Sequence, residues 1–238
     1  MPASSESQRE PLSRSVEDYL KAIHRLSADG RPASTTQIAD ALAVAPPSVT
    51  GMVKRLSEQG LLSHEPYRGV TLTDLGLREA RRVIRRHRLI ETYLVGFLGY
   101  TWDSVHDEAE RLEHAVSDAL VERMAAALGH PQVDPHGDPI PDAQGALAHV
   151  ALTPLAALPV GTHAAVRRVA TNDAERLRFL ASAGLVPGAR VRVVGQQPFD
   201  GPTTVALGDG EQVVGREMSR LVECETLSGV TETSTARP

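Results

Sequence analysis

The sequence predicts a mainly α-helical protein with a small amount of β-structure. Apolar residues recur at helical spacing in the first half of the 238 residues, with long amphipathic segments at 72–99 and 105–128. The run GHPQVDPHGDPIPDAQG at 129–145 is rich in Pro, Gly and Asp, which predicts a loop or linker. From residue 163 onward, short β-rich runs alternate with Gly/Asp turns around one helix. Two helical parts and a β-rich third part follow from these observations.

The first part begins with three predicted helices. The first helix is indicated by the helical spacing of Val16, Leu20, Ile23 and Leu26. Ser34 and Gln37 fit a capping box at the start of a short second helix, TTQIADALA. After a tight Val44-Ala45 connection, Pro46-Pro47 suits the first turn of a third helix, PPSVTGMVKRLSEQG, which buries its apolar face and ends at Gly60.

A hairpin after these helices completes a predicted winged helix-turn-helix. In LLSHEPYRGVTLTDLG, two β-like runs flank the turn at 66–69. The third helix of such a unit lies in the major groove of double-stranded DNA. We expect Pro47, Ser48 and Thr50 near the bases, and the hydroxyls of Thr35 and Thr36 at a helix N-terminus. The expected backbone contacts are Lys54, Arg55 and, at the hairpin tip, Arg68. The alternative is a small helical domain whose Ser and Thr residues are only caps.

The net charge of −5 argues at first against a nucleic-acid partner, but the charge is segregated. Residues 1–90 carry 14 basic and 10 acidic residues, whereas residues 91–150 carry 2 and 11. A basic block followed by an acidic one predicts an anionic partner for the first and cations for the second. The lone Cys224, the polar N-terminus and the lack of a long apolar run favour a cytoplasmic protein without a membrane span.

The acidic block shows metal-ligand spacing. His87 and Glu91 are four residues apart on one predicted helix. A second predicted helix, over 105–128, places two imidazoles and two carboxylates in one stripe at i, i+4, i+7 and i+8: His106, Glu110, Glu113 and His114. Like charges at this spacing repel unless they are paired or bind a cation. A solvated acidic face with incidental histidines is the alternative, and spacing alone does not decide between them.

From Ser15 to Gly145 the sequence resembles the metal-dependent repressors of the diphtheria toxin repressor and manganese transport regulator family. The runs EDYLKAI, PPSVTGMVKRL, HRLIE, VHDEAERLEH and GDPIP carry this resemblance in order and spacing. Residues 163–224 resemble the SH3-like barrel that ends the long members. The implied domains are a winged helix at 1–76, a helical metal-binding and dimerisation domain at 77–145, a linker at 146–159, an SH3-like (FeoA-like) domain at 160–226 and a tail at 227–238.

The resemblance also implies two metal sites. A primary site would comprise Asp18, Glu110, Glu113 and His114, and an ancillary site would comprise His87, Glu91 and His106. The barrel domain would add Asp173 or Glu175, unless both are helix N-terminal acids. Asp18 has an alternative role in a capping box that starts at Ser15.

Carboxylates stand at 18 and 110, where iron-responsive members have Met and Cys. This favours Mn²⁺ over Fe²⁺, with Co²⁺, Ni²⁺, Cd²⁺ and Zn²⁺ as surrogates in vitro. Lys21 replaces a glutamate of the short manganese regulators, so their two-ion cluster is not expected. Gly51 stands where the toxin repressor has a base-contacting glutamine, so its operator sequence does not transfer.

Together these features predict a homodimeric, manganese-responsive repressor of metal-uptake genes that binds operator DNA. An iron-responsive repressor of the same architecture is the main alternative, and a metal-independent winged-helix protein is another. A metallohydrolase is disfavoured because the sequence has no HExxH motif and no evident nucleophile–base arrangement. We therefore expect no enzymatic activity, no small organic substrate and no membrane partner.

Overall fold

The computed structural model describes residues 12–28, 30–65, 68–148 and 150–227. The chain forms two compact units, one of Met1–Arg85 with Pro141–Ala146 and the other of Arg86–Ile140 with Leu147–Pro238. Helix α4 (Asp74–Leu98) passes from the first unit into the second between Arg85 and Arg86. Pro66 and Tyr67 of the predicted hairpin turn, and residues 228–238 of the predicted tail, lie outside the described residues.

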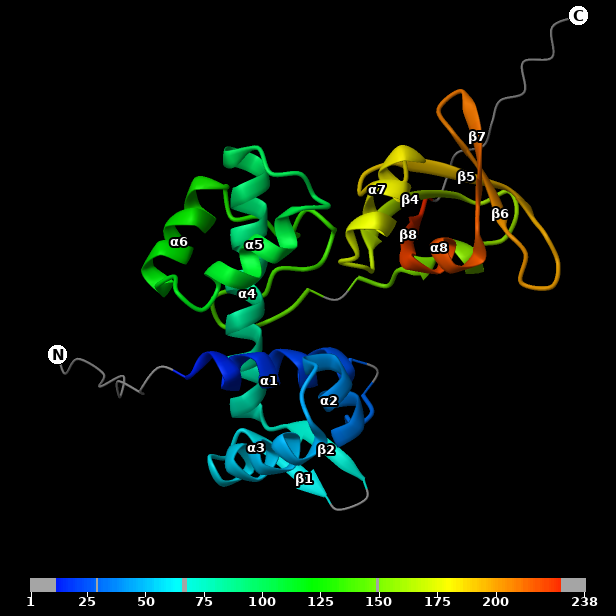
Figure 1. Ribbon diagram of the computed structural model, residues 1–238. Helices are drawn as coiled ribbons and strands as arrows, with labels where there is room; N and C mark the ends of the chain where they lie inside the picture. The colour runs from blue at the N-terminus through cyan, green and yellow to red at the C-terminus, as the bar shows by residue number, and fades with distance from the viewer. Residues whose placement is uncertain (1–11, 29, 66–67, 149, 228–238) are drawn as a thin grey trace, which may run out of the picture. The chain divides into compact units, whose positions relative to one another are not determined.

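The first unit has the predicted order of a winged helix-turn-helix (Figure 1). Its elements are α1 (Arg14–Leu26), α2 (Thr35–Leu42), α3 (Pro46–Glu58), β1 (Leu62–Glu65) and β2 (Gly69–Leu72). The capping box is confirmed, because Ser34 Oγ accepts from Gln37 N and Gln37 Oε1 accepts from Ser34 N. The two strands pair antiparallel, and Val70 also exchanges hydrogen bonds with Ala33. This joins the wing to the segment before α2.

One buried core holds the first unit together. Leu20, Ile38 and Leu56 come from α1, α2 and α3, and none of them is exposed to solvent. Val70 of the wing and Ala80 of α4 pack into the same core. The first half of α4 is therefore a structural part of the winged-helix unit.

The helical part of the second unit differs from the prediction in one respect. Instead of one helix over 105–128, the chain forms α5 (Val105–Leu112) and α6 (Asp118–Ala127). The break covers residues 113–117 and ends at Ser117, whose Oγ accepts from Leu120 N and caps α6. Glu113 and His114 consequently lie in the turn after α5 rather than on a continuous helical stripe.

The rest of the second unit is a β domain with a sheet of six antiparallel strands in the order β3-β8-β4-β5-β6-β7. Its strands are β3 (Thr153–Pro154), β4 (His163–Val169), β5 (Arg190–Gln196), β6 (Thr203–Leu207), β7 (Gly210–Val214) and β8 (Val222–Thr226). Its helices are η1 (Leu155–Ala157), α7 (Ala174–Ser182) and α8 (Arg216–Leu221). Trp102, from the helical part, packs against the core of this domain.

No helix among the described residues combines the length and apolar character needed to cross a membrane.

Candidate metal centre and DNA-binding surface

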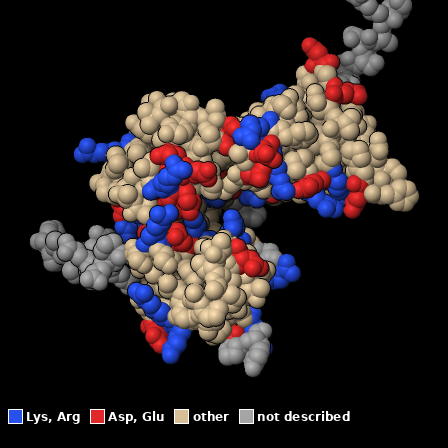
Figure 2. All heavy atoms as spheres, viewed as in Figure 1, with Lys and Arg blue, Asp and Glu red and all other residues tan. Residues whose placement is uncertain are grey.

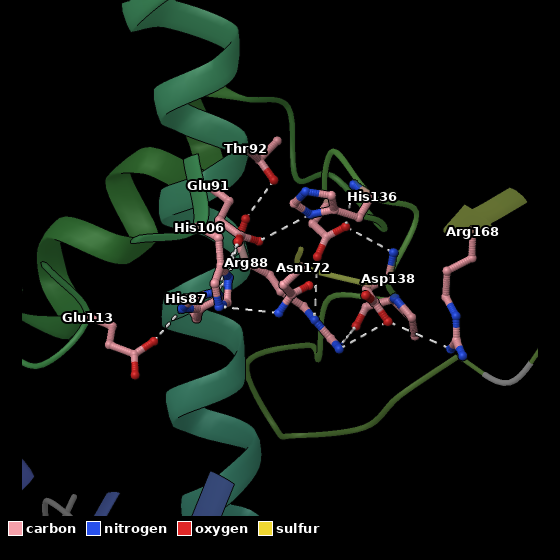
Figure 3. Close-up of polar contacts among 12 residues, drawn as sticks. His87, Arg88, Glu91, Thr92, His106, Glu113, His136, Asp138, Arg168 and Asn172 are labelled. Carbon is pink, nitrogen blue, oxygen red and sulfur yellow. Dashed lines mark hydrogen bonds and ion pairs between the residues drawn. The ribbon is translucent and has the colours of Figure 1, made fainter. Parts of the chain in front are cut away.

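His87 on α4 lies at the centre of a group of histidines and carboxylates (Figure 3). Its Nδ1 lies 2.5 Å from Glu113 Oε2, and its Nε2 lies 3.0 Å from Glu91 Oε1 and 3.1 Å from His106 Nδ1. Glu110 of α5 brings a carboxylate oxygen to 3.6 Å from His87 Nδ1. The three residues grouped as an ancillary site are thus in contact, and two residues of the predicted primary site adjoin them.

Burial and hydrogen bonds within this group shift the pKa values of its members. Burial would lower the pKa of His87, but its hydrogen bonds to Glu113 and Glu91 outweigh burial and raise that pKa to about 9. Burial would raise the pKa of Glu91, yet hydrogen bonds from His106 and His87 hold it well below its usual range. A proton on His87 therefore occupies the place of a positive charge between carboxylates. An imidazole must lose that proton before it can bind a metal.

Three of the four residues of the predicted primary site lie together in the second unit. Glu110, Glu113 and His114 offer donor atoms within 4.8 Å of one another, and Glu113 is completely buried. Asp18 belongs to the first unit, where its carboxylate lies 4.0 Å from Arg14. The alternative capping role of Asp18 is wrong, because α1 begins at Arg14 and Asp18 lies inside the helix.

A second buried group, which was not predicted from the sequence, is formed by Glu91, Asp134 and His136. These three side chains also offer donor atoms within 4.8 Å of one another. His136 Nε2 lies 2.7 Å from the carbonyl oxygen of Trp102, which can only accept a hydrogen bond. Nε2 therefore carries the proton, and the other nitrogen, Nδ1, faces Glu91 Oε2 at 3.8 Å. A backbone carbonyl that fixes the tautomer in this way is typical of metal-binding histidines.

Asp134 is held in place by the chain around it. Its Oδ1 accepts from the backbone N–H groups of His136 and Asp138 at 2.8 and 2.9 Å, and its Oδ2 lies 3.6 Å from Arg88 Nε. Burial, together with the charges of Asp138 and Glu91, raises the pKa of Asp134 to about 7. Two buried carboxylates beside an imidazole nitrogen form a place suited to a cation. The sequence signal was Asp134-x-His136, hidden in a segment interpreted as a loop or linker.

The β domain reaches the His87 group through Asn172. The Asn172 side-chain amide lies 3.2 Å from His106 Nε2, and rotation of that amide by 180° would present its oxygen instead. Asp173, predicted as a ligand, accepts from Arg176 N as the N-cap of α7. Glu175 lies exposed in the first turn of α7. The structure thus places Asn172, rather than Asp173 or Glu175, beside the candidate site.

All donor atoms in these groups are oxygen or nitrogen. Cys224 of β8 is 1% exposed within the core of the β domain, where burial raises the pKa of its thiol to about 12. Carboxylates and imidazoles without a thiolate fit a hard divalent cation such as Mn²⁺. The residues present therefore suit the metal that the sequence predicts.

The predicted DNA-binding residues lie on the outside of the first unit. On α3, Val49, Val53 and Leu56 are buried, and the opposite face exposes Pro47, Ser48, Thr50, Lys54 and Arg55. Thr36 and Arg68 are exposed as well, and Thr35 is half-buried. Over α3, at the lower left of Figure 2, basic side chains stand beside acidic ones, and Lys54 Nζ lies 4.0 Å from Glu58. The exposed face mixes hydroxyl groups with cations, as a surface for phosphates and bases requires.

Three protein-family models match successive parts of the chain. The "Iron dependent repressor, N-terminal DNA binding domain" matches residues 11–70, the "Iron dependent repressor, metal binding and dimerisation domain" matches residues 73–142, and the FeoA domain matches residues 153–226. The iron-dependent repressor IdeR of Mycobacterium tuberculosis is 33% identical over 222 residues, which covers 88% of this chain and 96% of that protein. This chain belongs to the diphtheria toxin repressor family. It is a metal-dependent, DNA-binding transcriptional repressor and not an enzyme.

Solved structures of family members support the same assignment. A manganese-dependent transcriptional repressor in complex with manganese has a TM-score of 0.81 and 40% identity, covering 89% of this chain and all of that one. ScaR with bound Cd²⁺ has a TM-score of 0.77 and 33% identity, covering 89% of this chain and 99% of ScaR. The repressor thus shares its fold along most of its length with relatives crystallised with divalent metals.

Proposed function

We propose that this repressor responds to Mn²⁺ and blocks transcription of metal-uptake genes when manganese is plentiful. The observation that carries the proposal is the donor set around His87, Glu91 and His136, which contains carboxylates and imidazoles without a sulfur ligand. Soft thiolate or thioether ligands would favour other metals, whereas oxygen-rich sites suit Mn²⁺.

Iron is the second candidate, and relatives support each metal. The manganese-dependent repressor noted above shares 40% identity with this chain, and the IdeR relatives, named as iron-dependent, share 33%. The carboxylates of Asp18 and Glu110, two of the proposed primary ligands, support manganese. Both would offer oxygen to the ion. A given site binds the later first-row metals more tightly than manganese or iron, so selection of manganese depends on the type of ligand and on the metal supply.

Two groups of ligands are proposed to bind metal. A primary site would use Asp18 of α1 with Glu110, Glu113 and His114, and an ancillary site would use His87, Glu91 and His106. Asp134 and His136 extend the ancillary ligands around Glu91. The bound ion would supply positive charge among buried carboxylates. Glu113 would then no longer need the proton of His87 as its positive partner.

Regulation follows from the location of the proposed ligands on different units. Asp18 lies in the winged-helix unit, and the other primary ligands lie in the unit that carries the dimerisation domain. Binding one ion through both would restrict the positions that the two units can take. A dimer must hold its two α3 helices about one DNA turn apart, roughly 34–36 Å, so metal binding would select the DNA-competent state.

Apolar side chains on the helical part support the homodimer. Phe97 and Leu98, at the end of α4, are 55% and 60% exposed, and Leu120 of α6 is 43% exposed. These large apolar side chains are exposed in the segment that matches the dimerisation domain, where a second subunit could cover them. We assign them to the contact with a second subunit.

The test is DNA binding as a function of metal. Operator sequences would be selected from a random duplex library with the Mn²⁺-loaded protein, and binding would then be titrated by fluorescence anisotropy. Tight binding with Mn²⁺ that disappears in excess chelator supports the proposal, and equal binding in chelator contradicts it. Transcription of the selected genes in cells limited separately for manganese and for iron then distinguishes the two metals.

A further inference from the structure

We propose that residues 134–146, termed the strap, carry the effect of metal binding to the winged-helix unit, with Arg81 and Arg85 as its positioning residues. This inference rests on the proposed metal response and adds the part of the chain that transmits it. The strap begins at the candidate ligands Asp134 and His136 and ends within the first unit, to which residues 141–146 belong.

Three arginines of α4 bind the strap through its backbone. Arg81 Nη1 donates to Gly145 O at 3.0 Å, Arg85 Nη1 donates to Pro141 O at 2.8 Å, and Arg88 Nη1 donates to Pro139 O. Positions 81, 85 and 88 are one helical turn apart and share one face of α4. Along these three pairs the residue numbers rise in α4 and fall in the strap, so the strap runs antiparallel to α4. Glu91, the next residue on that face, meets His136.

The start of the strap is fixed to both parts of the second unit. His136 O accepts from Val169 N of β4 at 2.9 Å, and Asp138 Oδ1 lies 3.3 Å from Arg88 Nη2. Gly137 has φ +88°, and a Cβ at this position would lie 1.9 Å from Arg167 O. Ile140 packs in a buried cluster with Leu89. These contacts fix the backbone at the start of the strap, so a displacement of Asp134 or His136 is passed on to the residues that follow them.

The end of the strap is a compact turn on the first unit. Asp142 Oδ1 accepts from Gln144 N and Ala146 N at 2.9 and 2.7 Å, and Asp142 N donates to Ala146 O at 2.9 Å. This turn meets the half of α4 that packs in the winged-helix core through Ala80. A displacement of residues 142–146 therefore acts directly on the part of α4 that belongs to the DNA-binding unit.

Two chain connections between the units restrict their movement more than a single connection would. Helix α4 passes from one unit to the other between Arg85 and Arg86, and the strap passes between Ile140 and Pro141. The strap is therefore a second chain connection between the units, and its backbone is bound by arginines of α4 on each side of the crossing. A cation shared by Glu91, Asp134 and His136 would hold the strap at its start and oppose its displacement. The side chains that transmit this restraint are Arg81 and Arg85, because they hold its other end.

The test compares the full-length protein with its R81A/R85A variant by hydrogen–deuterium exchange, with Mn²⁺ and with chelator. In the wild type, Mn²⁺ should slow exchange both in residues 134–140 and in residues 142–146. In R81A/R85A, it should still slow exchange in 134–140 but no longer in 142–146. Operator affinity measured by anisotropy should lose roughly tenfold of its Mn²⁺-dependent gain, within the usual range of coupling between sites.

Two controls separate a positioning role from damage to the fold. R81K/R85K keeps a donor for each carbonyl and should restore most of the Mn²⁺-dependent gain. R82A removes an arginine of the same helix that pairs with Glu79 on the surface and should behave as the wild type. Circular dichroism and thermal unfolding in chelator check that each variant folds.

The outcomes distinguish the strap from the proposed function. If Mn²⁺ fails to strengthen DNA binding by the wild type, the metal response itself is wrong, and the strap falls with it. If Mn²⁺ strengthens DNA binding but fails to protect residues 134–140, the strap alone is overturned. If Mn²⁺ acts on the wild type as proposed but R81A/R85A keeps the full gain or the protection at 142–146, the strap alone is overturned.

Discussion

Replacing Asp134 with Asn should stabilise the metal-free protein while weakening its metal binding. The amide can keep both backbone hydrogen bonds that Asp134 Oδ1 accepts, from His136 N and Asp138 N, so the local fold is preserved. What changes is the buried negative charge beside Glu91 and Asp138. Arg88 keeps its hydrogen bond to Pro139 O and its ion pair with Asp138, so it is not left buried without a partner.

The magnitude follows from the pKa of Asp134, which burial and the neighbouring carboxylates raise from 3.8 to about 7. When folding raises the pKa of an acid, the acid destabilises the folded state most at a pH above the folded pKa, because it is then charged in both states. At 1.36 kcal/mol per pKa unit, this difference means that the charge costs about 4 kcal/mol at pH 8. D134N should therefore raise the free energy of unfolding by this amount at pH 8, and by less than half of it at pH 5.

The assay is urea unfolding in chelator at pH 5 and pH 8, followed by calorimetric titration with Mn²⁺. D142N is the matched control, because Asp142 Oδ1 also accepts from two backbone N–H groups but the residue is exposed. The D142N protein should therefore have nearly the same free energy of unfolding as the wild type. A D134N protein that is less stable than the wild type at pH 8 in chelator would refute the electrostatic argument. Unchanged Mn²⁺ titrations would show that Asp134 is not a ligand.

Three further predictions concern separate parts of the molecule. Glu110→Ala should leave the fold intact and weaken Mn²⁺-dependent operator binding by at least roughly tenfold, since a ligand should matter no less than its supporting residues; a wild-type anisotropy titration would remove Glu110 from the site. Gly137→Ala should destabilise the protein by roughly 3 kcal/mol or more in urea unfolding, because of its φ of +88° and the contact with Arg167 O; a loss under 1 kcal/mol would contradict this geometry. Cys224, with its buried thiol and a pKa of about 12, should resist Ellman's reagent at pH 8 until the protein unfolds; rapid labelling that Mn²⁺ blocks would instead make it a ligand.

Local signals in the sequence were enough to predict the winged-helix unit. The Ser34–Gln37 box and the Pro46-Pro47 helix start depend on neighbours within a few residues, and the structure has both. The prediction of a continuous helix over 105–128 was wrong because helical periodicity runs through the break, whereas α5 ends at Leu112 and the capping hydroxyl of Ser117 starts a new helix. Periodicity reports which residues face a core, not whether the backbone between them stays helical.

The candidate site was only partly predictable for a different reason. His87 and Glu91 share a helix face, so their spacing alone places them together. Asp134 and His136 lie in a segment whose composition indicates a linker, and only tertiary packing against Trp102 and α4 buries them. Asn172 and Asp173 are neighbours, and the N-cap of α7 takes the carboxylate while the amide meets His106. Distinctions of this kind depend on three-dimensional contacts that no local pattern carries.

The most direct test of metal-controlled DNA binding is the affinity of the protein for Mn²⁺ with and without operator DNA. Coupling between two binding sites is reciprocal, so the factor by which Mn²⁺ tightens DNA binding must equal the factor by which DNA tightens Mn²⁺ binding. We predict equal factors well above one, from anisotropy for DNA and calorimetry for Mn²⁺. A Mn²⁺ affinity that operator DNA leaves unchanged would contradict the account.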